Sequence, residues 1–211
     1  MRLRAEHIIV HPENPQTRLL SKALERLHAG AVIAYPTDSC YALGCAIGDK
    51  SAMERIRRLR GFDKNHHFTL LCRDLSEIAN YARINNADYR LLKAHTPGPY
   101  TFILNATREV PRRVQHGQRK TIGIRVPENP IALAMLGLIN EPLMSCTLML
   151  PGEPYPLSDP NDILDLIGHE VDVVIDGGNC GLEPTSIIDL TGDAPQVIRA
   201  AKGDLSAFNP A

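Results

Sequence analysis

The 211-residue sequence contains no tryptophan, and aromatic residues make up only 5% of it. It also lacks any apolar run close to the roughly 18 residues that a membrane-spanning helix needs. The charged start Met1–Glu6 leads directly into His7–Val10, so an apolar signal-peptide core is missing. Hydrophobic residues nevertheless account for 44% of the chain, which excludes intrinsic disorder. We therefore expect a globular protein of the cytoplasm with no membrane partner.

Metal-binding, redox and common nucleotide-binding motifs are also missing. The sequence has no CxxC, HExxH or GxSxG pattern, no GxxxxGK[ST] phosphate loop and no GxGxxG fingerprint. Adjacent His66 and His67 cannot both face one metal from a strand, because neighbouring side chains alternate between its two sides, so we expect them in a surface loop. The turn-rich segment 176–181 fits either an anion-binding nest or a simple turn. Five scattered cysteines are typical of reduced thiols in the cytosol: Cys40, Cys45, Cys72, Cys146 and Cys180.

The net charge of −1 is an average over two opposed stretches of the chain. Residues 50–125 hold 16 Lys and Arg against 6 Asp and Glu. Residues 141–193 hold no Lys or Arg and 11 Asp and Glu. Such asymmetry favours contact with a polyanion on one side, although a dipolar surface without a function would give the same counts.

Helix and strand patterns alternate along the whole chain. Five helix starts or stops carry recognisable signals: Asn14-Pro15, the capping box at Ser51–Glu54, Asn129-Pro130, Asp159-Pro160, and the stop at Thr96-Pro97. Short apolar runs of strand length lie between the helices, at residues 31–35, 68–72, 100–104, 122–126, 143–148, 171–175 and 187–190. Most of these runs are continuous, as in a sheet that is covered on both faces. We predict an α/β fold, one domain over residues 1–211 with a twisted, mixed parallel and antiparallel sheet flanked by helices.

Three motifs carry hydrogen-bonding side chains to the ends of predicted strands. The run Tyr35–Gly44 reads YPTDSCYALG and leaves the end of a buried strand, where α/β sheets bind ligands. The run 96–104 reads TPGPYTFIL and enters a strand through a proline-stiffened turn. The run 121–127 reads TIGIRVP and places Thr121 and Arg125 on one side of a strand. An arginine in an apolar strand needs a partner, which is either an internal carboxylate or a phosphate.

In combination, the PTDxxYxL loop, the PGPxTFIL turn and the TxxxRxP strand resemble the YrdC/YciO family over nearly the whole chain. Ser39 and Ala42 make it most similar to the YciO branch, since YrdC-type members usually carry Thr and Gly there. The resemblance implies binding of nucleotide or RNA. YrdC-type members are nucleotidyltransferases that make threonylcarbamoyl-AMP from L-threonine, bicarbonate and ATP, with Mg²⁺, for the modification of tRNA. The implied partners are therefore ATP or an acyl-adenylate, an L-threonine-like molecule, and tRNA or double-stranded RNA.

The resemblance also implies site residues. Positions that hold the threonine-like ligand match Thr37, Arg125, Ser145 and Thr185. Nucleotide-contacting positions match Arg60, Thr121, Thr147 and Arg199. Two positions depart from the family pattern, because Phe62 and Met149 stand where YrdC-type members carry an arginine and an asparagine that grip phosphates. The loss of these contacts predicts weak or altered synthase activity.

Basic side chains cluster in two segments near these motifs. The first lies on and after a predicted helix and contains Arg55, Arg57, Arg58 and Lys64. The second lies in the 105–120 connection and contains Arg108, Arg112, Arg113, Arg119 and Lys120. Aromatic residues are not interleaved with these charges, so recognition of phosphates in folded or double-stranded RNA fits better than base stacking. An RNA-binding protein without catalysis is the alternative function, and a solvated charged face is the alternative without function.

Overall fold

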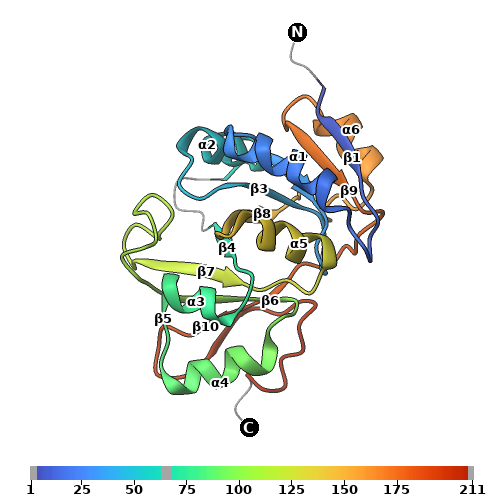
Figure 1. Cartoon of the computed structure of the whole chain (residues 1–211). Helices are drawn as coiled ribbons and strands as arrows, with labels where there is room; N and C mark the ends of the chain where they lie inside the picture. The colour runs from blue at the N-terminus through green and yellow to red at the C-terminus, as the bar shows by residue number, and fades with distance from the viewer. Residues whose placement is uncertain (1–3, 63–67, 209–211) are drawn as a thin grey trace.

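Eleven strands form one continuous sheet in the computed structural model, which describes residues 4–62 and 68–208 (Figure 1). The strands are β1 (Glu6–Ile9), β2 (Ile33–Tyr35), β3 (Ala42–Ala46), β4 (Thr69–Leu71), β5 (Ala82–Arg83), β6 (Tyr100–Ala106), β7 (Thr121–Arg125), β8 (Leu143–Thr147), β9 (Val173–Asp176), β10 (Ser186–Asp189) and β11 (Gln196–Arg199). Their order across the sheet is β1-β9-β2-β3-β8-β4-β7-β6-β10-β11, and β5 pairs with β6. Strands far apart in sequence therefore lie side by side at the centre of the sheet.

The sheet is mixed, as the sequence predicts. β1, β9 and β2 are parallel, as are the pairs β4–β7 and β6–β10. β3 and β8 are antiparallel to their neighbours, as are the pairs β6–β7 and β10–β11. The registers Thr69↔Ser145 and Thr69↔Gly123 place these three residues in one row at the centre. This row becomes the floor of the candidate site.

Six helices flank the sheet in the described part of the chain: α1 (Thr17–His28), α2 (Lys50–Arg60), α3 (Leu75–Tyr81), α4 (Asn86–His95), α5 (Pro130–Ile139) and α6 (Pro160–Ile167). The starts predicted at Asn129-Pro130 and Asp159-Pro160 are confirmed, since each cap side chain accepts a backbone N–H of the first turn. The capping box predicted at Ser51 is wrong. Asp49 caps α2 instead, because its carboxylate accepts the Ala52 N–H at 2.9 Å.

Alternation along the strands separates two hydrophobic clusters on opposite faces of the sheet. Leu70 and Met144 belong to one cluster, while their neighbours Leu71 and Leu143 belong to the other. Side chains of α2, α3, α4 and α6 pack into the first cluster, and side chains of α1 and α5 pack into the second. The fold class predicted from sequence, an α/β fold with a mixed sheet flanked by helices, is confirmed.

No helix in residues 4–62 and 68–208 is long and apolar enough to cross a membrane.

Candidate functional site

A cavity of about 260 Å³ opens over the central row of the sheet. Its floor comes from β4, β7 and β8, and its walls come from β6, β10 and β11, from the loop before β3 and from the end of α2. The lining residues that carry polar side chains are Ser39, Tyr41, Arg60, Thr69, Thr101, Arg125, Ser145, Thr147, Thr185 and Arg199. Three cations and a set of hydroxyl groups thus face one concave space.

Gly123 leaves room at the centre of this floor. A Cβ atom added to Gly123 would lie 3.2 Å from Thr69 Oγ1 and 3.3 Å from Thr101 Cγ2. Both distances are tighter than an ordinary van der Waals contact, so even a methyl group would crowd the two threonines. The missing side chain therefore exposes the hydroxyl-bearing neighbours to the cavity.

The loop of residues 36–41 joins two antiparallel strands at the cavity edge. It is shorter than the sequence predicts, because β3 already begins at Ala42. Thr37 holds this loop together: its Oγ1 donates to the Cys40 carbonyl at 2.7 Å and accepts the Ser39 N–H at 3.2 Å. Thr37 is buried and does not line the cavity. The structure thus places this predicted ligand contact behind the lining, as a support of the loop.

Arg125 forms a buried ion pair with Asp38 at the inner end of the cavity. The distance from Arg125 Nη2 to Asp38 Oδ1 is 2.5 Å, and the two side chains are 9% and 10% exposed. Asp38 Oδ1 also accepts the Glu128 N–H at 3.1 Å, and Lys202 donates to the Asp38 carbonyl. Of the two partners expected for Arg125, the structure provides the internal carboxylate. The Arg125 side chain still lines the cavity, so a ligand can reach it.

A polar wall on the opposite side connects β6, β10 and β11. Thr101 Oγ1 lies 2.9 Å from Thr185 Oγ1, within hydrogen-bond distance. Arg199 donates from Nε to the Thr185 carbonyl at 2.9 Å and from Nη2 to Thr185 Oγ1 at 3.1 Å. Burial lowers the pKa of Arg199, but the guanidinium group keeps its charge at neutral pH. The wall therefore offers a partly desolvated cation that two hydrogen bonds hold in place.

Ser145 is oriented from below by a fully buried tyrosine. The Tyr35 hydroxyl lies 2.6 Å from Ser145 Oγ, and Tyr35 is 0% exposed. Burial raises the pKa of Tyr35 well above its ordinary value, so the phenol stays neutral and able to donate. Ser145 thus has one hydrogen-bond partner inside the protein and its remaining capacity toward the cavity.

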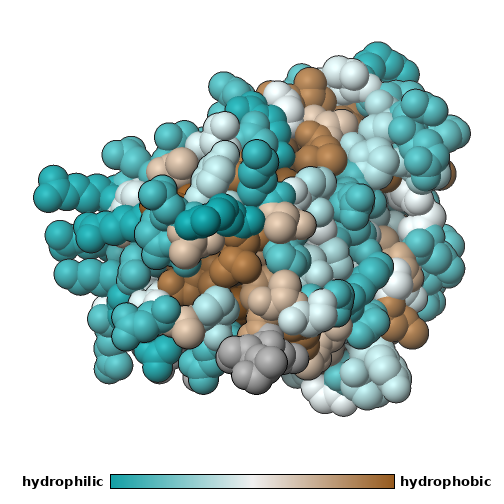
Figure 2. All heavy atoms as spheres, turned by 90° about the horizontal axis from the view of Figure 1, so that it is seen from below, coloured by the Kyte–Doolittle hydropathy of each residue, from teal (hydrophilic) through white to brown (hydrophobic). Residues whose placement is uncertain are grey.

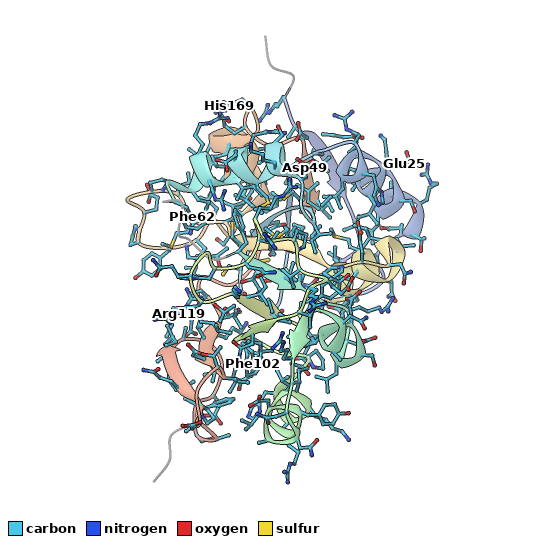
Figure 3. All side chains as sticks on the ribbon, turned by 90° about the vertical axis from the view of Figure 1, so that its left-hand side faces the viewer. Glu25, Asp49, Phe62, Phe102, Arg119 and His169 are labelled. Atoms are coloured by element: carbon cyan, nitrogen blue, oxygen red, sulfur yellow. The ribbon has the colours of Figure 1, made fainter. Side chains whose placement is uncertain are left out.

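Arg60 enters the cavity from the end of α2. Burial lowers the pKa of Arg60, and its guanidinium carbon lies 4.5 Å from the centroid of the Phe62 ring, a cation–π distance. Cys146 packs beside it, and burial raises the pKa of this thiol to about 12, so it is protonated at neutral pH. Figure 3 shows Phe62 beyond the end of α2, whose start is marked by Asp49. A flat aromatic surface thus borders the cation at the position where the resemblance implies an arginine.

The structure brings together most of the residues predicted for the site. Arg60, Arg125, Ser145, Thr147, Thr185 and Arg199 all line the cavity. Thr121 does not: its hydroxyl is buried, and within the described residues it has no hydrogen-bond partner. Met149 also lies outside the lining, whereas Phe62 is part of it. Of the two positions at which the resemblance implies a departure, only Phe62 therefore lies on the surface of the cavity.

Sequence reasoning missed several lining or supporting residues. Thr69 and Thr101 line the cavity, and Tyr35 and Asp38 hold residues that do. A signal existed for Thr101, because it alternates with buried Phe102 in the predicted strand. Asp38 lay in the singled-out loop, but its pairing with Arg125 depends on contacts 87 positions apart in sequence.

The two predicted basic clusters differ in their partners. On α2, Arg55 pairs with Asp172 at 2.8 Å, Arg57 with Glu54 at 2.6 Å, and Arg58 with Glu170 at 3.3 Å. These three charges are balanced by carboxylates of the same chain. Three other residues named in the sequence analysis lie outside the described residues: Lys64, the fourth member of the first cluster, and the neighbouring His66 and His67.

The second cluster lies in the β6–β7 connection and is mostly unpaired. Arg113 donates to the Gly48 carbonyl at 3.0 Å. Within the described residues, the side chains of Arg112, Arg119 and Lys120 are exposed and make no hydrogen bond or ion pair. The acidic stretch 141–193 thus neutralises part of the first cluster and leaves the second available.

Comparison with known proteins identifies the family. A sequence profile of the Sua5/YciO/YrdC domain, described as "Telomere recombination", matches residues 25–201. The chain belongs to the Sua5/YciO/YrdC family. YciO of Escherichia coli is 52% identical over 204 residues, covering 97% of this chain and 99% of YciO. The crystal structure of that protein superposes with a TM-score of 0.94.

Members of the Sua5/YciO/YrdC family with a named activity are more distant. A threonylcarbamoyl-AMP synthase of Halorhodospira halophila is 31% identical over 169 residues, covering 79% of this chain and 87% of the synthase. Sua5 of Pyrococcus abyssi, solved in complex with L-threonine, has a TM-score of 0.83 at 27% identity. The match covers 92% of this chain and 57% of the Sua5 chain. The chain is therefore related to threonylcarbamoyl-AMP synthases, and the resemblance predicted from its motifs is confirmed.

The side chains around the cavity decide whether the protein itself can hold the Mg²⁺ expected from the family. No carboxylate is among the described residues that line the cavity. Asp38 contacts the lining through Arg125: its Oδ1 is engaged by Arg125 and the Glu128 N–H, and its Oδ2 is buried without a hydrogen-bond partner. No group of three or more His, Cys, Asp or Glu side chains in the described residues is arranged to hold a metal. Mg²⁺ commonly binds through substrate phosphates and few protein ligands. The residues therefore fit Mg²⁺ as the counter-ion of ATP, as part of a substrate.

Proposed function

We propose that the cavity binds ATP together with an L-threonine-like amino acid, and that the protein retains weak threonylcarbamoyl-AMP synthase chemistry. The observation that carries the proposal is the convergence of three arginines and a set of hydroxyls on one space: Arg60, Arg125 and Arg199 with Thr69, Thr101, Ser145, Thr147 and Thr185. Guanidinium groups suit carboxylates and phosphates, and hydroxyls suit the polar atoms of a small amino acid. The relation to Sua5, solved with L-threonine, supports the amino-acid half.

The proposed reaction joins a carbamate to AMP. The amino group of L-threonine and bicarbonate first form a carbamate: a C–N bond forms, the C–OH bond of bicarbonate breaks, and water leaves. One oxygen of the carbamate then attacks the α-phosphorus of ATP. A new P–O bond forms, the bond to the β-phosphate oxygen breaks, and pyrophosphate leaves with its electron pair. No protein nucleophile is required, so the protein contributes by positioning the reactants and stabilising charge.

The arginines of the cavity have separable tasks in this proposal. Arg199, held by Thr185, stabilises charge on the phosphoryl oxygens that gain it in the transition state. Arg125, held by Asp38, receives the carboxylate of the amino acid. Mg²⁺ accompanies the triphosphate and lowers its repulsion from the attacking oxygen.

Phe62 limits this chemistry. It provides no hydrogen-bond donor beside Arg60, whereas an arginine would add a forked one. The loss of one charge-assisted contact to a phosphate costs about 1.5–3 kcal/mol, or roughly 10- to 100-fold in rate. We therefore expect turnover well below that of family members with the arginine.

The test mixes the protein with ATP, Mg²⁺, L-threonine and bicarbonate, and measures pyrophosphate and the adenylate. Phe62→Arg should raise turnover about 10-fold or more, and Arg199→Gln should abolish it. Arg58→Gln serves as the control, because Arg58 pairs with Glu170 outside the cavity and should leave turnover unchanged. Neither synthesis nor breakdown of the adenylate above the buffer rate, in the natural protein and in folded Phe62→Arg, would refute the proposal.

RNA binding is the second function we propose, and the unpaired charges of the β6–β7 connection favour it. Arg112, Arg119 and Lys120 have no partner within the described residues, whereas the arginines of α2 are ion-paired. The connection forms the left edge of the molecule in Figure 1. Exposed cations on a projecting edge can contact phosphates without reading bases.

Duplex RNA or tRNA should bind at low salt and be released as salt rises. With about three phosphate contacts, the slope of log K against log salt should be roughly −3. Arg119→Gln should reduce the slope by about one and weaken all sequences equally, while Arg58→Gln should change neither. If micromolar RNA does not bind at 50 mM salt, RNA is not a partner.

A further inference from the structure

A second concavity lies in the β6–β7 connection, apart from the cavity described above. It measures about 840 Å³ and shares none of its lining residues with the first. Residues from β5, the end of β6 and the connection itself line it. We call it the basic groove, because Arg83, Arg108, Arg112 and Lys120 surround it.

The four cations of the basic groove are not neutralised by the protein. No carboxylate lines the groove among the residues that the structure describes. In the same part of the chain, the side chains of all four are exposed and make no hydrogen bond or ion pair. Four like charges that converge without a counter-charge repel one another, and an anion between them would relieve that repulsion.

The backbone at Lys120 is held in an unfavourable conformation beside the groove. Its φ of 53° lies in the left-handed region, which a residue with a long side chain seldom adopts. Three main-chain hydrogen bonds hold it there: Lys120 N–H donates to the His116 carbonyl, the His116 N–H to the Thr121 carbonyl, and the Ala106 N–H to the Lys120 carbonyl. Retained backbone strain of this kind clusters at binding sites. It is an observation independent of the charge.

The size and lining of the groove indicate the class of ligand. Its volume of about 840 Å³ leaves room for a small polyanion. No Phe or Tyr side chain lines it in the described residues, and the one ring in the lining, His116, is held by the Gln118 and Arg119 N–H groups, which its Nδ1 accepts. Charge, more than base stacking, is therefore what the groove offers a ligand. The long hydrophilic side chains at the left edge of Figure 2, which corresponds to the left edge of Figure 1, extend from the same side of the molecule as the connection.

We infer that the basic groove binds a compact oligophosphate, an anion with at least three negative charges on adjacent phosphate groups. The inference does not depend on the nucleotide cavity. It shares Arg112 and Lys120 with the RNA proposal and differs from it in the others, because Arg83 and Arg108 line the groove and Arg119 does not. The phosphate groups can be inorganic or attached to a small organic molecule, since the groove recognises the charge and the oxygens.

Calorimetry with inorganic triphosphate at 50 mM salt, without Mg²⁺, tests the inference. Triphosphate should bind more tightly than pyrophosphate, and orthophosphate should bind weakest. Arg112→Gln and Lys120→Gln should each weaken triphosphate binding about tenfold, the loss of one charge-assisted contact. Arg113→Gln is the matched control: it removes the same charge from the next residue, which is bonded to the Gly48 carbonyl and lies outside the groove lining.

Two further arms distinguish the sites and the sources of phosphate. Arg199→Gln, in the other cavity, should leave the groove signal intact. If Arg199→Gln removes the signal instead, or Arg113→Gln weakens it as much as Arg112→Gln does, the groove is not the site. Duplex RNA should compete poorly with triphosphate. RNA that displaces triphosphate and loses affinity equally in Arg119→Gln and Arg83→Gln would overturn the compact ligand in favour of a nucleic-acid backbone.

Discussion

Breaking the buried ion pair between Arg125 and Asp38 should strongly destabilise the protein, because it leaves one buried charge without its partner. Asp38→Asn removes the negative charge and leaves the guanidinium of Arg125, only 9% exposed, without its counter-charge. Removing one partner of a buried pair costs about 3–5 kcal/mol. We expect the lower end, about 3 kcal/mol, since Arg125 also lines a cavity that admits water. For a chain of this length, the melting temperature should fall by about 6–12 °C.

A double-mutant cycle measures the coupling energy between Arg125 and Asp38, apart from the effect of each residue alone. Arg125→Met leaves Asp38 unpaired and should be about as harmful as Asp38→Asn. The double variant, with Asp38→Asn and Arg125→Met together, leaves no buried charge. Its loss of stability should therefore be smaller than the sum of the losses in the two single variants. We expect a coupling energy of about 2–3 kcal/mol. Urea unfolding followed by far-ultraviolet circular dichroism is the suitable assay, because the chain has no tryptophan to report by fluorescence.

Arg4 and Asp165 provide the control pair. Their nitrogen–oxygen distance is 2.6 Å, almost the same as in the Arg125–Asp38 pair, but their side chains are 67% and 73% exposed. Solvent screening should keep their coupling below about 0.5 kcal/mol. If the two cycles give equal coupling, or if the Arg125 and Asp38 variants are additive, burial is not what makes the central pair strong, and the reasoning fails.

Two other predictions concern the cavity floor and a thiol near the loop. Gly123→Ala adds a methyl group 3.2 Å from Thr69 Oγ1. It should weaken the binding of L-threonine and ATP about tenfold or more, and it should lower the free energy of unfolding by only about 1 kcal/mol. An unchanged affinity by calorimetry would show that the ligand does not reach this floor. Burial raises the pKa of Cys180 to about 11, so the thiolate fraction should rise about tenfold per pH unit from pH 7 to about pH 10. Because the thiolate is the nucleophile, the rate of alkylation by iodoacetamide should rise in the same way. A rate that levels off near pH 8.5, as in the urea-unfolded chain, would contradict the burial of this thiol.

Helices and strands could be predicted from the sequence where the residues that define them are neighbours in the chain. The starts of α5 and α6 were predictable, because cap and proline lie next to each other in the chain. β3 was not, since Ala42–Ala46 consists mostly of small residues with weak strand preference and becomes a strand by pairing between β2 and β8. Local patterns identify elements whose stability is local, whereas pairing partners from distant segments decide the rest.

The same distinction explains the candidate site. Alternation correctly placed Thr121 and Arg125 on one face of β7, but it could not tell how far the cavity extends along that strand. The cavity reaches Gly123 and stops before Thr121. In the same way, the sequence shows the basic residues of α2 but only one of their carboxylate partners, Glu54, on the same helix. The other two partners, Glu170 and Asp172, come from a segment more than 100 positions away.

The backbone conformation at Phe62 is set independently of its side chain. Gly61 ends α2 in the left-handed conformation, with φ 62°, and the Phe62 N–H donates to the Arg57 carbonyl at 3.0 Å. This is a Schellman motif, in which the helix end fixes the backbone of the residue after the glycine. Its conformation is therefore set by main-chain bonds and not by the identity of its side chain. An arginine or a phenylalanine can occupy position 62 with the same backbone, so this end of the cavity can be altered while the central row of the sheet remains intact.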